Sequence, residues 1–128
     1  MATQGRVLVI DDEPSIHKLI AFILEEEGFV VLSHEAHEEA KRLVDRGRPD
    51  VIILDIFMPE VDGFDILKML KSDEETRHIP VIILTVSNMQ LDKEKASSLG
   101  AYRYLTKPFE PARLVEAVKD ALNGLRVG

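Results

Sequence analysis

Four short apolar runs in this chain are each followed closely by polar side chains. They are residues 7–10 followed by Asp11 and Asp12, 51–54 by Asp55, 81–84 by Thr85, and 102–105 by Lys107. Runs of this length and composition are typical of strands buried on both faces of a sheet. If the four strands are parallel, their polar residues lie at one edge of the sheet, where open α/β sheets hold their sites. Three carboxylates, a hydroxyl and an ammonium group would then converge.

The segments between these runs have the period of amphipathic helices, and Pro14 is placed to open the first of them. The apolar stripes are Ile16, Leu19, Ile20, Ile23 and Leu24, ending at Gly28; Ala36, Ala40, Leu43 and Val44, ending near Gly47; Ile66, Leu67 and Leu70; residues 91–99; and Leu114, Val115, Val118, Leu122 and Leu125. A further short strand is predicted at residues 29–32. Strands that alternate with helices predict an α/β fold with a doubly wound, five-stranded parallel sheet, (βα)5, covered on both faces by right-handed crossovers.

The length of 128 residues suits one domain, residues 1–128 with a core of about 5–125, and no linker is evident. The chain carries 16 Lys and Arg against 23 Asp and Glu, which gives a net charge of −7. No run of basic residues interrupts this acidic balance, so a nucleic-acid backbone would be repelled. We therefore expect no direct nucleic-acid partner.

The chain has no cysteine, which excludes disulfides, thiol catalysis and cysteine-ligated zinc. Residues 1–6 lack the apolar segment of a signal peptide, and no apolar run approaches the length that crosses a bilayer. These features predict a cytoplasmic protein that is not inserted in a membrane.

The predicted cluster of Asp11, Asp12 and Asp55 needs a cation. Two carboxylates about 4 Å apart repel by about 4 kcal/mol at an effective dielectric constant near 20, so three together require protonation or a positive partner. A hard divalent ion with oxygen ligands meets this need. Mg²⁺ in particular takes one or two carboxylates, keeps several waters and accepts a phosphate oxygen.

Each of these residues also has a simpler interpretation. Asp11 and Asp12, with Ser15, would cap the first helix, because acids are favoured near a helix N-terminus. Thr85 alone would be an ordinary strand residue, and Lys107 alone a solvated charge. Asp55 is harder to explain in this way, because the segment after it continues into Met58-Pro59. The set together favours a functional site.

The histidines suggest a different kind of site. His34-Glu35 and His37-Glu38 are three residues apart, as in a metal pair or the His-acid pair of a phosphotransfer helix. Because no third ligand has suitable spacing, we interpret them as solvated side chains. His17 and His78 have no evident partner in the sequence.

The four polar positions together resemble the receiver domain of response regulators. The matching features are Asp11-Asp12 after the first strand, the segment from Asp55 to Gly63 that contains Met58-Pro59, Thr85 after the fourth strand, and Lys107-Pro108-Phe109 after the fifth. They occur in the family's order and span nearly the whole chain. The resemblance implies a flavodoxin-like fold, and it implies that the Lys107–Pro108 peptide bond is cis.

The resemblance also implies a role for each residue of the cluster. An ionised carboxylate such as Asp55 is already a nucleophile, so attack on phosphorus would give an aspartyl phosphate. The metal would be Mg²⁺, for which Mn²⁺ can substitute, held by Asp12 and Asp55 directly, by the backbone carbonyl of Phe57, and by Asp11 through water. Lys107 and the Thr85 hydroxyl would contact the remaining phosphoryl oxygens, because phosphoryl transfer depends mostly on positioning and charge neutralisation.

The function implied is a signalling switch with no substrate turnover of its own beyond slow self-dephosphorylation. The donor would be a phosphohistidine on a sensor histidine kinase or a histidine phosphotransfer protein. Phosphorylation of Asp55 would draw Thr85 toward the phosphoryl group and turn Tyr104 inward, which would reshape the face made by the fourth helix, fifth strand and fifth helix for a downstream protein. Alternatively, Tyr104 simply fills the interior.

Two other functions remain open from the sequence. A Mg²⁺-dependent phosphohydrolase with an aspartyl nucleophile usually carries a second acid two residues after the nucleophile, but Phe57 occupies that position here. A pseudo-receiver that acts only as an interaction module would not need Asp12, Asp55, Thr85 and Lys107. We also expect no output domain in this chain.

Two positions depart from the family pattern. Val86 follows Thr85 where receivers often have a small residue, so access to phosphorus would be narrowed. Tyr102 and Arg103 stand where regulators with winged-helix DNA-binding domains commonly have acids used in dimer salt bridges. That mode of dimerisation is therefore not expected here.

Overall fold

The structure, a computed structural model, describes residues 4–34 and 40–127. This part of the chain forms a sheet of five parallel strands in the order β2-β1-β3-β4-β5. The strands are β1 (Gly5–Ile10), β2 (Phe29–His34), β3 (Val51–Leu54), β4 (Val81–Thr85) and β5 (Arg103–Thr106). The predicted five-stranded parallel sheet is confirmed.

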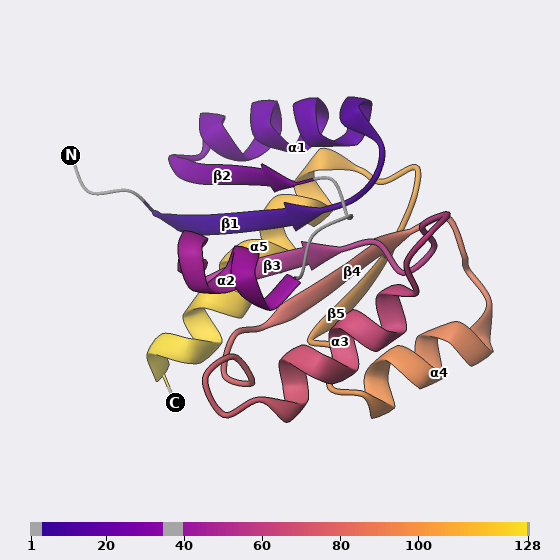
Figure 1. The fold of residues 1–128 in the computed structure, drawn as a ribbon. Helices are drawn as coiled ribbons and strands as arrows, with labels where there is room; N and C mark the ends of the chain where they lie inside the picture. The colour runs from indigo at the N-terminus through magenta and orange to yellow at the C-terminus, as the bar shows by residue number, and fades with distance from the viewer. Residues whose placement is uncertain (1–3, 35–39, 128) are drawn as a thin grey trace.

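Helices cover both faces of the sheet (Figure 1). They are α1 (Pro14–Glu26), α2 (Ala40–Gly47), α3 (Gly63–Ser72), α4 (Gln90–Ser98) and α5 (Pro111–Val127). On one face α1 and α5 pack against the sheet, and on the other face α2, α3 and α4 do so. The doubly wound α/β architecture is therefore as the sequence predicted.

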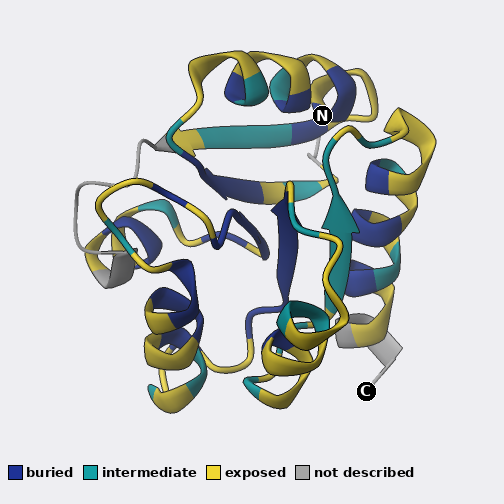
Figure 2. Cartoon of the chain, turned by 90° about the vertical axis from the view of Figure 1, so that its right-hand side faces the viewer, coloured by how far each residue is buried: buried dark blue, intermediate teal, exposed yellow. Residues whose placement is uncertain are grey.

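The alternation of side chains along each strand divides the core into two apolar layers. Val7, Val9, Ile53 and Ile82 face α1 and α5, whereas Leu8 and its neighbours in register face the other three helices. Every residue of β3 and β4 is buried, which explains why these strands appear as uninterrupted apolar runs. Figure 2 shows this buried centre with exposed residues on the outer sides of the helices.

Most predicted element boundaries agree with the structure, with small differences. Pro14 occupies the start of α1, and Gly28 adopts a φ of 90° just after it, a conformation that favours glycine at a helix end. The strand predicted at 29–32 continues to His34 because it pairs with β1 along its whole length. The strand predicted at 102–105 is shifted by one residue, to Arg103–Thr106. The predicted start of the second helix at Ala36 lies outside the described residues.

None of the described helices is long and apolar enough to cross a membrane.

Candidate functional site

The carboxyl ends of β1, β3, β4 and β5 bring the predicted polar residues together at one edge of the sheet. Four carboxylates, those of Asp11, Asp12, Glu13 and Asp55, each place an oxygen within 4.8 Å of the others. The ammonium nitrogen of Lys107 lies 2.8 Å from Asp11 Oδ2, 3.2 Å from Asp55 Oδ2 and 3.3 Å from Glu13 Oε1. The convergence expected from parallel strands is therefore present.

Asp55 occupies the centre of this arrangement. Its backbone N–H donates to the carbonyl of Ile10 at 3.0 Å and so extends the pairing of β3 with β1 by one residue. The side chain is only 5% exposed, and Oδ1 accepts a hydrogen bond from the backbone N–H of Phe57 at 3.0 Å. The sheet thus fixes the backbone of Asp55, and the following turn fixes the direction of its carboxylate.

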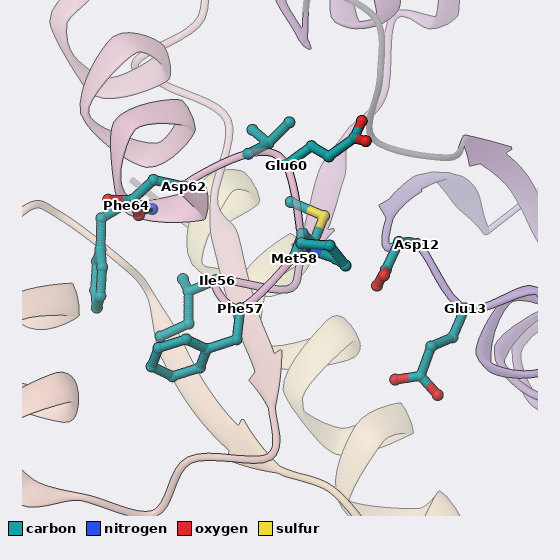
Figure 3. A pocket seen from close by; sticks show the side chains of 10 residues that line it. Asp12, Glu13, Ile56, Phe57, Met58, Glu60, Asp62 and Phe64 are labelled. Atoms are coloured by element: carbon teal, nitrogen blue, oxygen red, sulfur yellow. Dashed lines mark hydrogen bonds between the residues drawn. The ribbon is translucent and has the colours of Figure 1, made fainter.

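The loop between β3 and α3 forms one wall of an open pocket beside the acidic cluster. Figure 3 shows Asp12 and Glu13, from the turn after β1, across this pocket from Phe57 and Met58. The loop is closed at its ends, because Phe57 bridges to Asp62 and the N–H of Gly63 donates to the carbonyl of Ile56 at 3.2 Å. Its backbone, including the carbonyl of Phe57, is therefore held next to the carboxylates.

Gly63 is required where this loop meets α3. A Cβ at this position would lie 2.4 Å from the Cα of Ile56 and 2.5 Å from the carbonyl oxygen of Asp55. These contacts are with backbone atoms, which cannot rotate away. Asp62 accepts a hydrogen bond from the N–H of Phe64 at 2.8 Å, which caps the helix directly after the loop.

Thr85 is fully buried at the end of β4, and its hydroxyl has no hydrogen-bond partner among the described residues. An unpartnered buried hydroxyl costs free energy, so its presence needs a reason. The carbonyl of Thr85 accepts from the N–H of Lys107 at 2.7 Å, which ties the end of β4 to the segment that carries the lysine. The Lys107–Pro108 peptide bond is cis, which confirms that expectation.

Burial and the neighbouring charges shift the pKa of Lys107 in opposite directions, and the same holds for the pKa of Asp11. Burial alone would lower the pKa of Lys107, but its hydrogen bond to Asp11 and the charge of Asp55 together raise that pKa above 10.5. Burial raises the pKa of Asp11 above 3.8 and outweighs the hydrogen bond from Lys107. The ammonium group therefore stays protonated, while the acids favour any additional positive charge.

Tyr104 lies between the apolar core and the loop after β4. Its ring is partly buried against the layer of α2, α3 and α4, and its hydroxyl donates to the carbonyl of Ser87 at 2.8 Å. Burial raises the pKa of Tyr104 above 10.0 against the opposing effect of the hydrogen bond to Ser87, and the charges of Asp92 and Asp55 add smaller increases. The phenol thus anchors the loop after β4.

Two residues near the cluster were not predicted from the sequence. Glu13 adds a fourth carboxylate, and its position directly after Asp12 was the available signal. His17, for which the sequence showed no evident partner, places Nε2 2.6 Å from the backbone carbonyl oxygen of Asp11. The histidine and glutamate pairs at 34–38 lie outside the part of the chain whose side chains are described.

The interpretation of Asp11 and Asp12 as capping residues of α1 is only partly correct. Glu13 is the N-cap residue of α1 and makes no side-chain capping bond. Asp11 uses Oδ1 to accept from the N–H of Glu13 at 2.9 Å, whereas its Oδ2 faces Lys107. Asp11 therefore both shapes the turn and takes part in the cluster.

The two departures from the family pattern are also placed by the structure. Val86 is 66% exposed at the start of the loop after β4. Arg103 forms an ion pair with Asp120 on α5, with 2.8 Å between Nη2 and Oδ2. This arginine is therefore paired within the chain.

The chain belongs to the response regulator receiver domain family, whose model matches residues 7–119. It is 37% identical over 117 residues to the phosphate regulon transcriptional regulatory protein PhoB of Escherichia coli (strain K12), covering 91% of this chain and 51% of that protein. It is 36% identical over 116 residues to the polar-differentiation response regulator DivK of Brucella ovis, covering 91% of this chain and 94% of that protein. The chain thus spans about half the length of the PhoB proteins it matches.

Solved structures give the same family. A putative response regulator from Chloroflexus aurantiacus superposes with a TM-score of 0.86 at 30% identity, covering 93% of this chain and 98% of the other. The chemotaxis response regulator CheY4 of Vibrio cholerae gives a TM-score of 0.86 at 30% identity, covering 94% of this chain and 100% of the other. The flavodoxin-like fold implied by the sequence resemblance is confirmed.

Proposed function

We propose that this chain is a phosphorylation-activated signalling switch in which Asp55 accepts a phosphoryl group from a phosphohistidine. The observation that carries the proposal is the position of the buried Asp55 carboxylate among three other carboxylates, with the ammonium group of Lys107 3.2 Å from its Oδ2. Asp55 therefore lies beside both oxygen ligands for a cation and a positive charge. Membership of the receiver family supports the same function.

The donor set of the cluster fits Mg²⁺. Its members are carboxylate oxygens within 4.8 Å of one another, which are the ligands that hard divalent cations prefer. Asp12 and Asp55 would hold the ion directly, the Phe57 carbonyl would contribute as well, and Asp11 would act through water. When bound, Mg²⁺ or Mn²⁺ neutralises negative charge on the phosphoryl oxygens. Our proposal leaves Glu13 beside Lys107 and outside this set of ligands.

The transfer itself uses Asp55 as the nucleophile. A carboxylate oxygen forms a bond to phosphorus while the bond from phosphorus to the donor imidazole nitrogen breaks, and the released imidazole retains the electron pair. Lys107, whose ammonium nitrogen lies 3.2 Å from Asp55 Oδ2, contacts a phosphoryl oxygen. The Thr85 hydroxyl, which lacks a partner among the described residues before transfer, donates to another.

The phosphoryl group then changes the balance between two states of the loop after β4. It adds roughly −1.5 to −2 charge and several strong acceptors. Movement of Thr85 toward the phosphoryl group would pull on the loop after β4. Tyr104 holds this same loop through its hydrogen bond to the Ser87 carbonyl. Tyr104 turns inward when that bond breaks, and the face made by α4, β5 and α5 changes for a downstream protein.

The partners we propose are a sensor histidine kinase or histidine phosphotransfer protein and a downstream protein, in the cytoplasm. The net charge of −7 disfavours direct binding of this chain to nucleic acid. PhoB is named a transcriptional regulator, but this chain matches only 51% of it. For the part of the protein given by this chain, we propose a protein contact of the receiver face as the output.

The two alternatives are less well supported by the site. A phosphohydrolase needs a group to activate water two residues after the nucleophile, but Phe57 carries no polar atom in its side chain. A pseudo-receiver has no use for four neighbouring carboxylates, two of them buried, whose mutual repulsion costs free energy. A working phosphoacceptor explains both features.

Labelling with acetyl phosphate in Mg²⁺ tests the proposal against both alternatives. A switch takes up one phosphoryl group per chain, labile to base and hydroxylamine, and releases phosphate slowly. A hydrolase releases phosphate continuously with little label on the protein. A pseudo-receiver takes up no label and releases no phosphate, so either of these two results would contradict our proposal.

We expect Mg²⁺ affinity to depend on Asp12 more than on Asp11. Asp12 is assigned as a direct ligand, whereas Asp11 is engaged by Lys107 at 2.8 Å and reaches the ion through water. The affinities of Asp12→Ala and Asp11→Ala can be compared by calorimetry. Unchanged affinity in Asp12→Ala would overturn the ligand assignment.

Melting temperatures of the same two variants, measured without metal, report the repulsion within the cluster. Asp12→Ala relieves that repulsion and leaves the pair of Asp11 with Lys107 intact, so it should melt no lower than the wild type. Asp11→Ala also loses the buried pair with Lys107 and should melt lower than Asp12→Ala. A melting temperature of Asp12→Ala below that of the wild type would show that this acid stabilises the metal-free fold.

We also expect a long-lived phosphorylated state, set in part by Val86 and Phe57. Val86 is stiff and branched, and Phe57, 48% exposed, offers no group that orients the hydrolytic water. Val86→Ala and Phe57→Asn, singly and together, should shorten the half-life of the phosphorylated protein several-fold, measured as phosphate loss in excess Mg²⁺. Because both side chains are exposed, the fold should not change. An unaltered half-life in all three variants would show that access at this corner does not limit hydrolysis.

A further inference from the structure

His17 is a buried polar side chain that the proposed phosphoacceptor chemistry leaves unused. It lies on the inner face of α1 with Ile20 and Leu24, and it is 7% exposed. A position on this face would ordinarily hold an apolar side chain. The histidine places Nε2 2.6 Å from the carbonyl oxygen of Asp11, while Nδ1 is buried and has no hydrogen-bond partner in the described part of the chain.

The geometry determines which ring nitrogen carries the proton. A backbone carbonyl oxygen only accepts hydrogen bonds, so the nitrogen that faces it must donate. Nε2 therefore carries the hydrogen, and in the neutral ring Nδ1 is a bare acceptor. A buried acceptor without a donor costs free energy that leucine at the same position would not incur. The hydrogen bond from Nε2 to the Asp11 carbonyl is the interaction that leucine could not make.

The contact falls on the segment that carries the acidic cluster. Asp11, Asp12 and Glu13 connect the end of β1 to the start of α1, so their backbone belongs to neither element. A short turn between two fixed ends can still rotate its peptide planes. The bond from His17 ties the Asp11 peptide to the buried face of α1, and the bond from Glu13 N–H to Asp11 Oδ1 ties the same residue from the other side.

We propose that His17 is a positioning residue for metal binding: its Nε2–H holds the Asp11 carbonyl so that the carboxylates of Asp11 and Asp12 stay directed into the cluster. This inference rests on the proposed Mg²⁺ site. Groups that hold metal ligands in place change metal affinity although they do not touch the ion. His17 acts here through the backbone, so it orients two consecutive acids at once.

Three substitutions separate this role from packing. His17→Leu keeps an apolar side chain of similar size and removes the donor, whereas His17→Gln restores an N–H donor on a flexible chain. Thr76→Val is the matched control. The Thr76 hydroxyl is buried and donates to the carbonyl of Leu70 at 2.7 Å, also six residues away in sequence but beyond the opposite end of α3 from the cluster.

The measured quantity is the dissociation constant for Mg²⁺ alone, by calorimetry on the whole chain, with folding checked by urea unfolding. His17→Leu should bind Mg²⁺ about tenfold more weakly, the lower end of the range for groups that orient ligands. His17→Gln should recover most of the affinity. Thr76→Val should lower stability, because it removes a buried hydrogen bond, but leave the affinity within about twofold of the wild type.

A second readout needs no metal. Nitrogen NMR of histidine-labelled protein should show His17 as the tautomer with hydrogen on Nε2, and the Asp11 carbonyl carbon resonance should move in His17→Leu but less in His17→Gln. The other tautomer, or equal Mg²⁺ affinity in wild type and His17→Leu, would overturn the inference and leave the proposed function standing. Absence of Mg²⁺ binding by the wild type would overturn both. If His17→Leu does not fold, the tautomer and the His17→Gln affinity decide.

Discussion

An Asp55→Asn variant is expected to take up no phosphoryl group from acetyl phosphate and Mg²⁺. The amide is not a nucleophile toward phosphorus, and no other carboxylate directly follows β3. The amide oxygen would still accept the hydrogen bond from Phe57 N–H, and the substitution would remove one negative charge from the cluster, so the fold should be retained. Intact mass spectrometry measures the uptake as the gain of one phosphoryl group.

The matched control for this variant is Asp62→Asn. Asp62 lies on the same loop, and its side chain caps α3 by accepting from Phe64 N–H, which asparagine also does. This variant should be labelled at the wild-type rate. Labelling of Asp55→Asn equal to that of Asp62→Asn would show that the phosphoacceptor is a different residue.

The second large effect is expected from Lys107→Met in the absence of metal. The Lys107 side chain is 7% exposed and contacts two buried carboxylates, so its removal leaves buried charge without a partner. Loss of one member of such a group lowers the free energy of unfolding by about 3 kcal/mol. Mg²⁺ should restore much of this loss, because it supplies positive charge to the same carboxylates. Urea unfolding with and without Mg²⁺ measures both effects.

The pH dependence of the Lys107→Met effect follows from the two pKa directions. Because the pKa of Lys107 is raised, its contribution is complete below 10.5 and is lost as the pH rises through the folded value. The pKa of Asp11 is raised, so this acid becomes protonated as the pH falls toward 3.8. Protonation removes the unpaired buried charge of the variant, and the difference in the free energy of unfolding between Lys107→Met and the wild type should therefore shrink.

Lys119→Met serves as the control for removal of a lysine. Lys119 forms an exposed ion pair with Glu27 at 2.8 Å, and such pairs contribute at most about 1 kcal/mol. Its stability should therefore change little and should not respond to Mg²⁺. A loss in Lys107→Met no larger than in Lys119→Met would show that the cluster does not depend on the ammonium group.

The fold was predictable because the sheet is buried on both sides. Residues 51–54 and 81–84 have no polar position, and such runs, separated by helical stripes, leave few alternatives to a doubly wound parallel sheet. The same topology places the carboxyl ends of the strands at one edge. The meeting of Asp11, Asp55 and Lys107 therefore follows from strand order, and the sequence contained enough to predict it.

The remaining features depend on geometry that sequence patterns do not carry. His17 occupies an apolar position of a helical stripe, and only the path of the turn before α1 brings the Asp11 carbonyl to it. Tyr104 has a ring that suits the core and a hydroxyl whose partner, Ser87, is set by the course of a loop. The pairing of Arg103 with Asp120 likewise depends on how α5 lies beside β5. Each of these contacts joins a regular element to a turn, a loop or another element, and neither hydrophobic periodicity nor motif spacing determines it.

The close approach at Gly63 has a mechanical consequence. The backbone of Gly63 lies so close to that of Asp55 and Ile56 that no methyl group fits between them, so the end of β3 and the first turn of α3 are in direct contact. The helix also packs into the core along its length through Phe64, Leu67 and Leu70. A displacement of the Asp55 peptide would therefore press directly on the start of α3, through a contact that involves neither Thr85 nor Tyr104.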